Sequence, residues 1–270
     1  MSDQYVHGYH PRENERLQDQ AGTLVDLLHA DTFYPPGSRV LEAGCGVGAQ
    51  TITLAQRSPA ARFTCVDVNA ASVAEAKRRV DLAGLSNVEF AQGDLFDLLY
   101  EEASFDHVFV CFVLEHLPRP MEALASLRRL LKPGGTLTLI EGDHGSTYFH
   151  PENEAARAAI QCQVILQAQA GGNALIGRQV YPLLVEAGFT EVRVSPRQVY
   201  VDASRPDLVE GFTRKTFTAM IEGVREAAIK AGLATPGDFD AGIAALHRTT
   251  QPDGVFCYTF FKGVGTTAQW

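Results

Sequence analysis

A short segment from Val40 to Gly48 constrains the fold more than any other part of the chain. Aliphatic residues lead into Glu42, and glycines follow at alternate positions as Gly44, Gly46 and Gly48. This pattern is typical of a buried strand that ends in a tight turn and passes into a helix, and glycine lets a ligand approach the bare backbone N–H groups. The segment therefore predicts an α/β fold that holds a nucleotide-like ligand at the end of its first strand.

The glycine turn alone leaves the class of ligand open. With Ala49 it also fits the G-x-G-x-x-A pattern of dinucleotide-binding folds, and a purely structural tight turn is a further alternative. Glu42 favours a different ligand, because a carboxylate repels a pyrophosphate but can bind a hydroxyl or an ammonium group, directly or through water. We expect a cofactor with such a group rather than a dinucleotide.

Strand and helix signals alternate through the first half of the chain. Strands rich in aliphatic and aromatic residues are expected at 38–43, 62–67, 87–92, 105–111 and 135–141, with helices at 49–57, 70–84 and 119–131. This order predicts a doubly wound, mostly parallel sheet that is covered by helices on both faces. Such sheets bind ligands at the carboxyl ends of their strands.

The second half has a different rhythm, with an extra helical insertion. Helices are expected at 152–170 and 174–187, strands at 191–202 and 254–263, and a mostly helical insertion at about 205–250 between those strands. An insertion of this length in a compact domain usually forms a lid or carries binding residues. Its six basic and six acidic residues cancel, so the lid suits a small organic substrate better than a polyanion.

Composition limits the partners and the setting. The chain of 270 residues carries a formal charge of −9, which argues against a nucleic-acid partner, and it has no apolar run long enough to span a membrane. Its five cysteines are far apart, so neither a metal site nor a disulfide framework is indicated, and we expect a reducing cytoplasm. We expect one domain over 1–270, with an N-terminal cap at 1–34, a cofactor-binding core at 38–141 and a substrate-side half at 142–270.

Two further acidic residues follow expected strands. Asp67, followed by Val68 and Asn69, can accept both hydroxyls of a ribose, or Asp67 or Asn69 can cap the next helix, and the two roles are compatible. Asp94, between Gly93 and Leu95, can accept a hydrogen bond from an adenine amino group or form an Asx turn.

Two more elements complete the pattern. The ligand crevice should open after the fourth expected strand, near Phe112. The run from Leu131 to Gly135 contains Lys-Pro-Gly-Gly, which predicts a sharp turn from a helix into the next strand.

In this order and spacing, the elements over about 38–141 resemble those of the class I S-adenosylmethionine-dependent methyltransferases. The resemblance implies the strand order 3-2-1-4-5-7-6, with strand seven antiparallel, and S-adenosyl-L-methionine as cofactor. It also implies cofactor contacts from Glu42, Gly44, Gly46, Gly48, Asp67, Val68, Gly93, Asp94, Leu95 and Phe112.

The N-terminal segment adds a second resemblance. Tyr5 to Tyr9, followed by Arg12, Arg16 and Gln20, is similar to a subgroup of small-molecule and cofactor-biosynthesis methyltransferases in which an N-terminal helix closes over the cofactor. This implies contacts from Tyr9 and Gln20. The alternative is that 12–30 forms a helix that only packs against the core.

The expected chemistry is methyl transfer to a small organic acceptor by in-line displacement, for which alignment matters most. A hydroxyl or carbon nucleophile needs a general base, and His144, after the fifth expected strand, is the candidate because histidine titrates near neutral pH. Alternatively, His144 is a loop residue held between Gly142 and Gly145. Two other functions stay open, a nicotinamide-dependent oxidoreductase and a non-catalytic cofactor-binding module. The acceptor, its reacting atom and the oligomeric state are left open.

Overall fold

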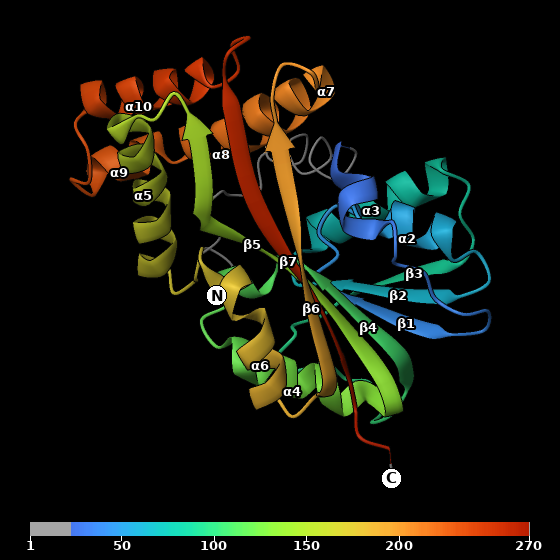
Figure 1. Ribbon diagram of the computed structural model, residues 1–270. Helices are drawn as coiled ribbons and strands as arrows, with labels where there is room; N and C mark the ends of the chain where they lie inside the picture. The colour runs from blue at the N-terminus through green and yellow to red at the C-terminus, as the bar shows by residue number, and fades with distance from the viewer. Residues whose placement is uncertain (1–22, 270) are drawn as a thin grey trace.

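The computed structural model describes residues 23–269, which form a seven-stranded sheet with helices on both faces (Figure 1). The strand order is β3-β2-β1-β4-β5-β7-β6, and β7 pairs antiparallel with both of its neighbours. This order and the antiparallel seventh strand confirm the expected fold class. The strands are β1 (Arg39–Ala43), β2 (Arg62–Asp67), β3 (Val88–Gln92), β4 (Phe105–Cys111), β5 (Leu131–His150), β6 (Thr190–Val201) and β7 (Val255–Thr266).

The helices between the parallel strands lie close to their expected positions. They are α2 (Thr51–Arg57), α3 (Ala70–Leu82) and α4 (Pro120–Leu130). Asn69 caps α3, because its side chain accepts a hydrogen bond from the N–H of Ser72 at 3.0 Å. In α4 the apolar side chains recur at helical spacing and are fully buried against the sheet: Ala123, Leu124, Leu127 and Leu130.

The two faces of the sheet have separate apolar cores. One core joins α4, the short 3₁₀ turn η2 (Ile176–Gln179) and α6 (Val180–Glu186) to the sheet. The other contains residues from α2 and from the helical residues 23–29, together with the second half of the chain. Residues 23–29 are the described part of the expected N-terminal cap. Tyr9 and Gln20 lie outside the described residues.

Strand β5 is longer than the sequence indicated. The expected strand at 135–141 runs from Leu131 to His150, because its distal part pairs with β7 from Tyr148 to His150. A β-bulge interrupts this ladder between Asp143 and Tyr148. In Figure 1 the outer parts of β5, β7 and β6 rise beyond the level of β1–β3, and helices lie beside them.

The insertion between β6 and β7 is helical, as expected, and we call it the roof (residues 206–248). It consists of α7 (Pro206–Leu208), the π-helix η3 (Val209–Thr218), α8 (Ala219–Gly223), α9 (Arg225–Lys230) and α10 (Pro236–Arg248), and α10 packs against α5 (Glu154–Gln169). A π-helix of this length is uncommon, and π-helical turns are frequently found at functional sites.

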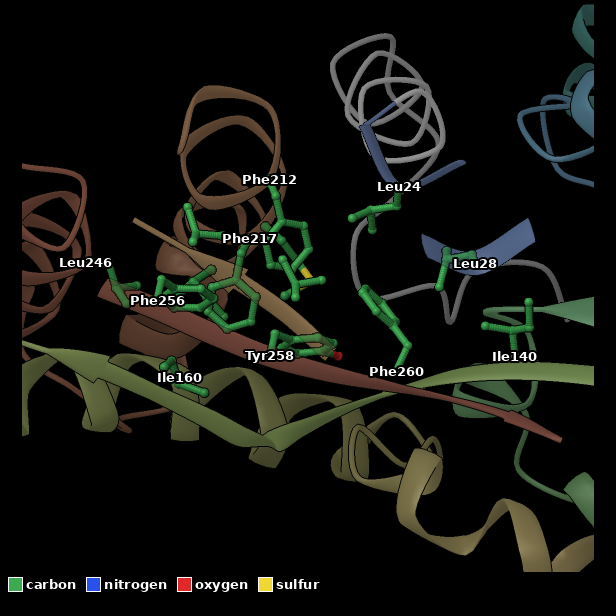
Figure 2. Packing of buried hydrophobic residues seen from close by; sticks show 14 of the residues in the cluster. Leu24, Leu28, Ile140, Ile160, Phe212, Phe217, Leu246, Phe256, Tyr258 and Phe260 are labelled. Carbon is green, nitrogen blue, oxygen red and sulfur yellow. The ribbon is translucent and has the colours of Figure 1, made fainter. Parts of the chain in front are cut away.

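Aromatic side chains join the roof to β7. Figure 2 shows Phe212 and Phe217 pointing from η3 toward Phe256 and Tyr258 on β7. The ring centroids of Phe217 lie 4.8 Å from Phe256 and 5.5 Å from Tyr258. The roof is therefore a packed part of the core rather than a loose loop.

Within residues 23–269, no helix combines the length and apolar character needed to cross a bilayer.

Candidate active site

The glycine turn after β1 has the open backbone that the sequence predicted. Gly44, Gly46 and Gly48 all have positive φ, at 79°, 52° and 77°. A Cβ on Gly44 would lie 2.5 Å from a methyl group of Val113, whereas a Cβ on Gly46 would meet nothing within 4 Å. Packing therefore excludes a side chain at Gly44, while Gly46 leaves free space over the turn where a ligand can touch the backbone.

Asp67 at the end of β2 ties this turn to the neighbouring strand. Its Oδ2 accepts a hydrogen bond from the N–H of Gly46 at 2.8 Å, and its Oδ1 accepts one from the N–H of Asn69 at 2.9 Å. Burial raises the pKa of Asp67 above its usual range. Each carboxylate oxygen has a second acceptor position, so these bonds leave Asp67 able to accept ligand hydroxyls.

Glu42 at the end of β1 is 2% exposed and lies beneath the turn. Its Oε2 accepts hydrogen bonds from the hydroxyl of Thr51 at 2.6 Å and from the thiol of Cys65 at 3.2 Å. Burial raises the pKa of Glu42 to about 7. The carboxyl group thus fastens the end of β1 to the first residue of α2, a role that the sequence did not indicate. Its contact with the cofactor stays a prediction.

The residues after β2 and β3 divide between surface and core. Val68 is half-exposed and Asp94 is exposed, whereas the side chain of Leu95 is buried in the core. Oδ1 of Asp94 accepts a hydrogen bond from the N–H of Phe96 at 3.0 Å, which forms the Asx turn that was the alternative reading. A Cβ on Gly93 would lie 3.1 Å from Leu98, so the chain passes closely there. Any ligand contact of Leu95 would come from its backbone.

Phe112 and Glu141 shape the crevice after β4. Phe112 has a positive φ of 57°, which is strained for a side chain of this size, and its ring lies 5.2 Å from that of Phe260. Oε1 of Glu141 accepts hydrogen bonds from the N–H groups of Val113 at 3.1 Å and Leu114 at 2.7 Å. Glu141 therefore holds the loop after β4, including Val113, against the glycine turn.

The Glu141 carboxyl group is fully buried. Its Oε2 has no hydrogen-bond partner among the described residues. Burial and the neighbouring Glu115 raise the pKa of Glu141 well above its usual range. Burial thus favours the neutral form of this carboxyl group, and a neutral acid can hold two backbone N–H groups without the cost of a buried charge.

The β5 bulge is rigid, although the sequence suggested a loop. Asp143 is bound by Arg178 through two hydrogen bonds of 2.7 and 2.8 Å, and its Oδ1 also accepts the N–H of Gly145 at 2.9 Å. The N–H of His144 donates to the carbonyl of Ala174 at 3.0 Å. Two elements therefore fix the backbone on both sides of His144.

His144 itself is 5% exposed and is placed in the bulge of β5, not in a loop beyond the strand. Its Nδ1 lies 3.0 Å from the hydroxyl oxygen of Tyr258 on β7. Its ring lies 6.1 Å from that of Phe217 in the roof. Sequence reasoning missed Tyr258, whose only signal is its place in the alternating aromatic series Phe256, Tyr258, Phe260.

The comparisons with known proteins agree with this geometry. Residues 40–135, which contain the glycine turn, Asp67, Asp94 and the turn into β5, match the sequence profile of a family described as a methyltransferase domain. Residues 40–135 are therefore a domain of the class I S-adenosylmethionine-dependent methyltransferase family.

The curated relatives that match this chain include bacterial proteins. The chain is 37% identical to an uncharacterized 37.1 kDa protein from a Streptomyces fradiae transposon, over 74% of this chain and 56% of that protein. It is 26% identical to the 27-O-demethylrifamycin SV methyltransferase of Amycolatopsis mediterranei, over 83% of this chain and 77% of the relative. A fatty-acid O-methyltransferase of Mycolicibacterium smegmatis is 36% identical over 53% of this chain and 51% of the relative. The chain spans about half the length of several of the curated relatives it matches.

Solved structures share its fold at low identity. The YcgJ protein of Bacillus subtilis superposes with a TM-score of 0.57 at 15% identity, over 95% of this chain and all of that chain. The [4+2]-cyclase SpnF superposes with a TM-score of 0.55 at 18% identity, over 93% of this chain and 82% of the cyclase. At such identities the likeness concerns the fold alone.

Proposed function

We propose that the protein transfers a methyl group from S-adenosyl-L-methionine to a small organic acceptor by in-line displacement. The observation that carries this proposal is the glycine turn, where the space over Gly46 is open while Gly44 and Gly48 are closed by packing. A ligand can approach the backbone at Gly46, beside the carboxylate of Asp67. The family of the chain and its methyltransferase relatives support the same function.

The residues that would hold the cofactor lie at the carboxyl ends of β1 to β4. The backbone from Gly44 to Gly48 would bind its amino-acid end. Asp67 would accept hydrogen bonds from its ribose hydroxyls, and Asp94 would accept one from its adenine amino group. Val68, Gly93, Leu95 and Phe112 would line the crevice, with Tyr9 and Gln20 from the N-terminal segment. When bound, the cofactor supplies a methyl group already activated on a sulfonium. The chain therefore has to align the acceptor and exclude water.

We infer that the acceptor is small and uncharged overall. The roof has almost as many basic as acidic residues, and some of them are paired on its surface, for example Arg225 with Asp240, so it has no excess positive charge to attract a polyanion such as nucleic acid. His144 faces the roof and is the candidate base for an acceptor that must lose a proton. All five cysteines are free thiols, which supports a reducing cytoplasmic setting.

Calorimetry of the full chain tests the proposed function. We expect S-adenosylmethionine and S-adenosylhomocysteine to bind with one-to-one stoichiometry, and NADH not to bind. Binding of NADH in place of the sulfonium cofactor would show a nicotinamide-dependent enzyme instead. Tight cofactor binding with no methyl transfer to any member of a broad acceptor panel would favour a non-catalytic binding module.

A further inference from the structure

The passage from the glycine turn into α2 is held by contacts within the core at 38–141. A Cβ on Gly48 would lie 3.0 Å from the Ala76 side chain of α3, so the end of the turn packs closely against that helix. The hydroxyl of Thr51, the first residue of α2, donates to Glu42 at 2.6 Å. The core therefore fixes the turn on the sides of β1 and α3.

A contact from the N-terminal segment reaches the same place. Nε2 of His29, at the end of the helical residues 23–29, lies 2.6 Å from Oε1 of Gln50. Gln50 is the N-cap residue of α2 and comes two residues after Gly48, and its side chain makes no capping bond to the helix. The side chain of Gln50 is therefore oriented by His29 and not by α2 itself.

The backbone on both sides of His29 is fixed to neighbouring elements. Leu28, one residue before it, points into the apolar core and is fully buried (Figure 2). Just after it, Oδ1 of Asp31 and the hydroxyl oxygen of Thr32 each lie 2.6 Å from Nζ of the buried Lys262 on β7. The imidazole therefore projects from a part of the chain that is anchored to the sheet.

The imidazole of His29 carries a cost that packing alone does not require. The side chain is fully buried, and its ring lies 5.8 Å from that of Phe109. Burial lowers the pKa of His29 to about 4, so the ring is neutral at pH 7. Because Nε2 faces the acceptor oxygen of Gln50, Nε2 carries the proton, and Nδ1 has no hydrogen-bond partner within residues 23–269. An unpartnered buried nitrogen destabilises the folded state, so the bond to Gln50 is what a histidine adds over an apolar residue.

We propose that His29 is a positioning residue for the cofactor: its hydrogen bond to Gln50 fixes the start of α2, and with it the glycine turn that binds S-adenosyl-L-methionine. This inference rests on the proposed function, which assigns the glycine turn to the cofactor. A backbone site binds well only if its N–H groups are held in the productive geometry before the ligand arrives. Cofactor affinity therefore depends on a contact from outside the core at 38–141.

Calorimetry of the full chain with S-adenosylhomocysteine tests this hydrogen bond. We expect His29→Leu to weaken binding about tenfold, and His29→Gln, whose amide nitrogen can take the place of Nε2, to restore it to within about threefold. Asp26→Asn is the matched control, because Asp26 joins the same helical residues to the other end of α2, through an ion pair with Arg57. The control should leave the affinity unchanged. Equal affinity of His29→Leu and the unmodified chain, or a loss that His29→Gln does not restore, would overturn the proposal.

Gln50→Ala removes the same hydrogen bond from a half-buried side chain, so it decides the matter even where His29→Leu does not fold. We expect it to weaken binding about tenfold as well. His29→Leu added to Gln50→Ala should weaken binding by less than about twofold more, because both substitutions act through one bond. Unchanged affinity in Gln50→Ala, or a second loss of full size in the double variant, contradicts the proposed positioning.

The stability of the variants should not follow their affinity. Urea unfolding at pH 7 should show His29→Leu to be as stable as the unmodified chain, because the substitution removes the unpartnered Nδ1 and keeps an apolar group against Phe109. A joint loss of stability and affinity that His29→Gln does not rescue would show a merely structural residue. An unmodified chain that does not bind S-adenosylhomocysteine would contradict the proposed function itself, whereas equal binding by the unmodified chain and the His29 variants would contradict only this inference.

Discussion

At the scale of single residues, two glycines with positive φ have equally open surroundings but lie in different parts of the fold. Gly46 and Gly84 both have positive φ, at 52° and 69°, and a Cβ on either would meet no atom within 4 Å. Gly46 lies in the ligand turn, whereas Gly84 lies between α3 and β3. A comparison of the same substitution at these two positions therefore separates the cost of backbone strain from the loss of space for the ligand.

Gly46→Ala and Gly84→Ala are expected to cost similar stability, about 1–2 kcal/mol each, because both place a side chain in the left-handed region. Only Gly46→Ala should weaken S-adenosylmethionine binding, by about tenfold or more, because its methyl group fills the space over the turn. Urea unfolding and calorimetry measure the two effects. Equal cofactor affinity in the two variants would contradict the assignment of the turn.

Glu42 predicts how stability depends on pH. Its pKa is about 7 in the folded protein and about 4.3 in the unfolded chain, so between these values the folded state binds more protons. Stability from this group is therefore greatest below pH 4 and falls as pH rises toward 7, by about 3.7 kcal/mol at most, at about 1.36 kcal/mol per pKa unit.

Glu42→Gln removes this titration and keeps an acceptor for the Thr51 hydroxyl. We expect the stability of the unmodified chain relative to Glu42→Gln to decrease from pH 5 to pH 8. Urea unfolding of both proteins at both pH values provides the measurement. A difference that does not change with pH would show that Glu42 is not protonated in the folded state.

At the scale of elements, the sequence predicted where strands β1 to β4 begin and end, but it did not predict the bulge in β5. Glycine turns, aliphatic runs and the Lys-Pro-Gly-Gly turn are local signals, so β1 to β4 were placed within a residue or two. The bulge depends on the register of β7, on Arg178 and on Ala174, which are remote in sequence. No local pattern around His144 encodes those partners, and for that reason a loop was expected there.

The clamp on this bulge gives a prediction at the same scale. Arg178 and Arg248 each bind an aspartate through two hydrogen bonds, but the Asp143 side chain is 3% exposed and that of Asp253 is 63% exposed. Arg178→Gln should therefore destabilise the protein by about 1–3 kcal/mol, because it leaves a buried carboxylate without its cation. Arg248→Gln should cost less than about 1 kcal/mol, since exposed pairs contribute little.

Urea unfolding compares the two variants. We also expect methyl transfer to fall in Arg178→Gln and to persist in Arg248→Gln, because only the first clamp holds His144. Similar losses of stability in both variants would mean that the burial of Asp143 does not determine how much stability the ion pair contributes.

At the scale of the whole molecule, the cofactor-binding half and the roof pack on the same sheet. The sequence predicted the arrangement of the first more completely than that of the second. The order of the seven strands followed from the motif set, whereas the packing of the roof on β7 depends on aromatic contacts such as Phe217 on Phe256. Those contacts join residues far apart in the chain, so the sequence indicated a helical insertion without showing which strand it covers.

Cofactor binding should stabilise the entire fold. With S-adenosylhomocysteine at a hundred times its Kd, the free energy of unfolding should rise by about 2.7 kcal/mol, because only the folded chain presents the turn. At the same concentration Gly46→Ala should gain about 1.3 kcal/mol less if its affinity is tenfold lower. Thermal unfolding with and without the ligand would show this, and an unchanged midpoint would contradict a preformed site.

The β5 bulge also reverses which residues of the strand, even-numbered or odd-numbered, point to a given face of the sheet. Before it, even-numbered Ile140 and Gly142 share a face with Phe260; after it, odd-numbered Phe149 pairs with Phe256, and their rings are stacked. Shortening the bulge by one residue would exchange the environments of Tyr148 and Phe149, turning a buried ring outward. The bulge thus determines both which face of the sheet the distal residues point to and where the His144 side chain lies. This segment can therefore be altered in evolution only as a unit.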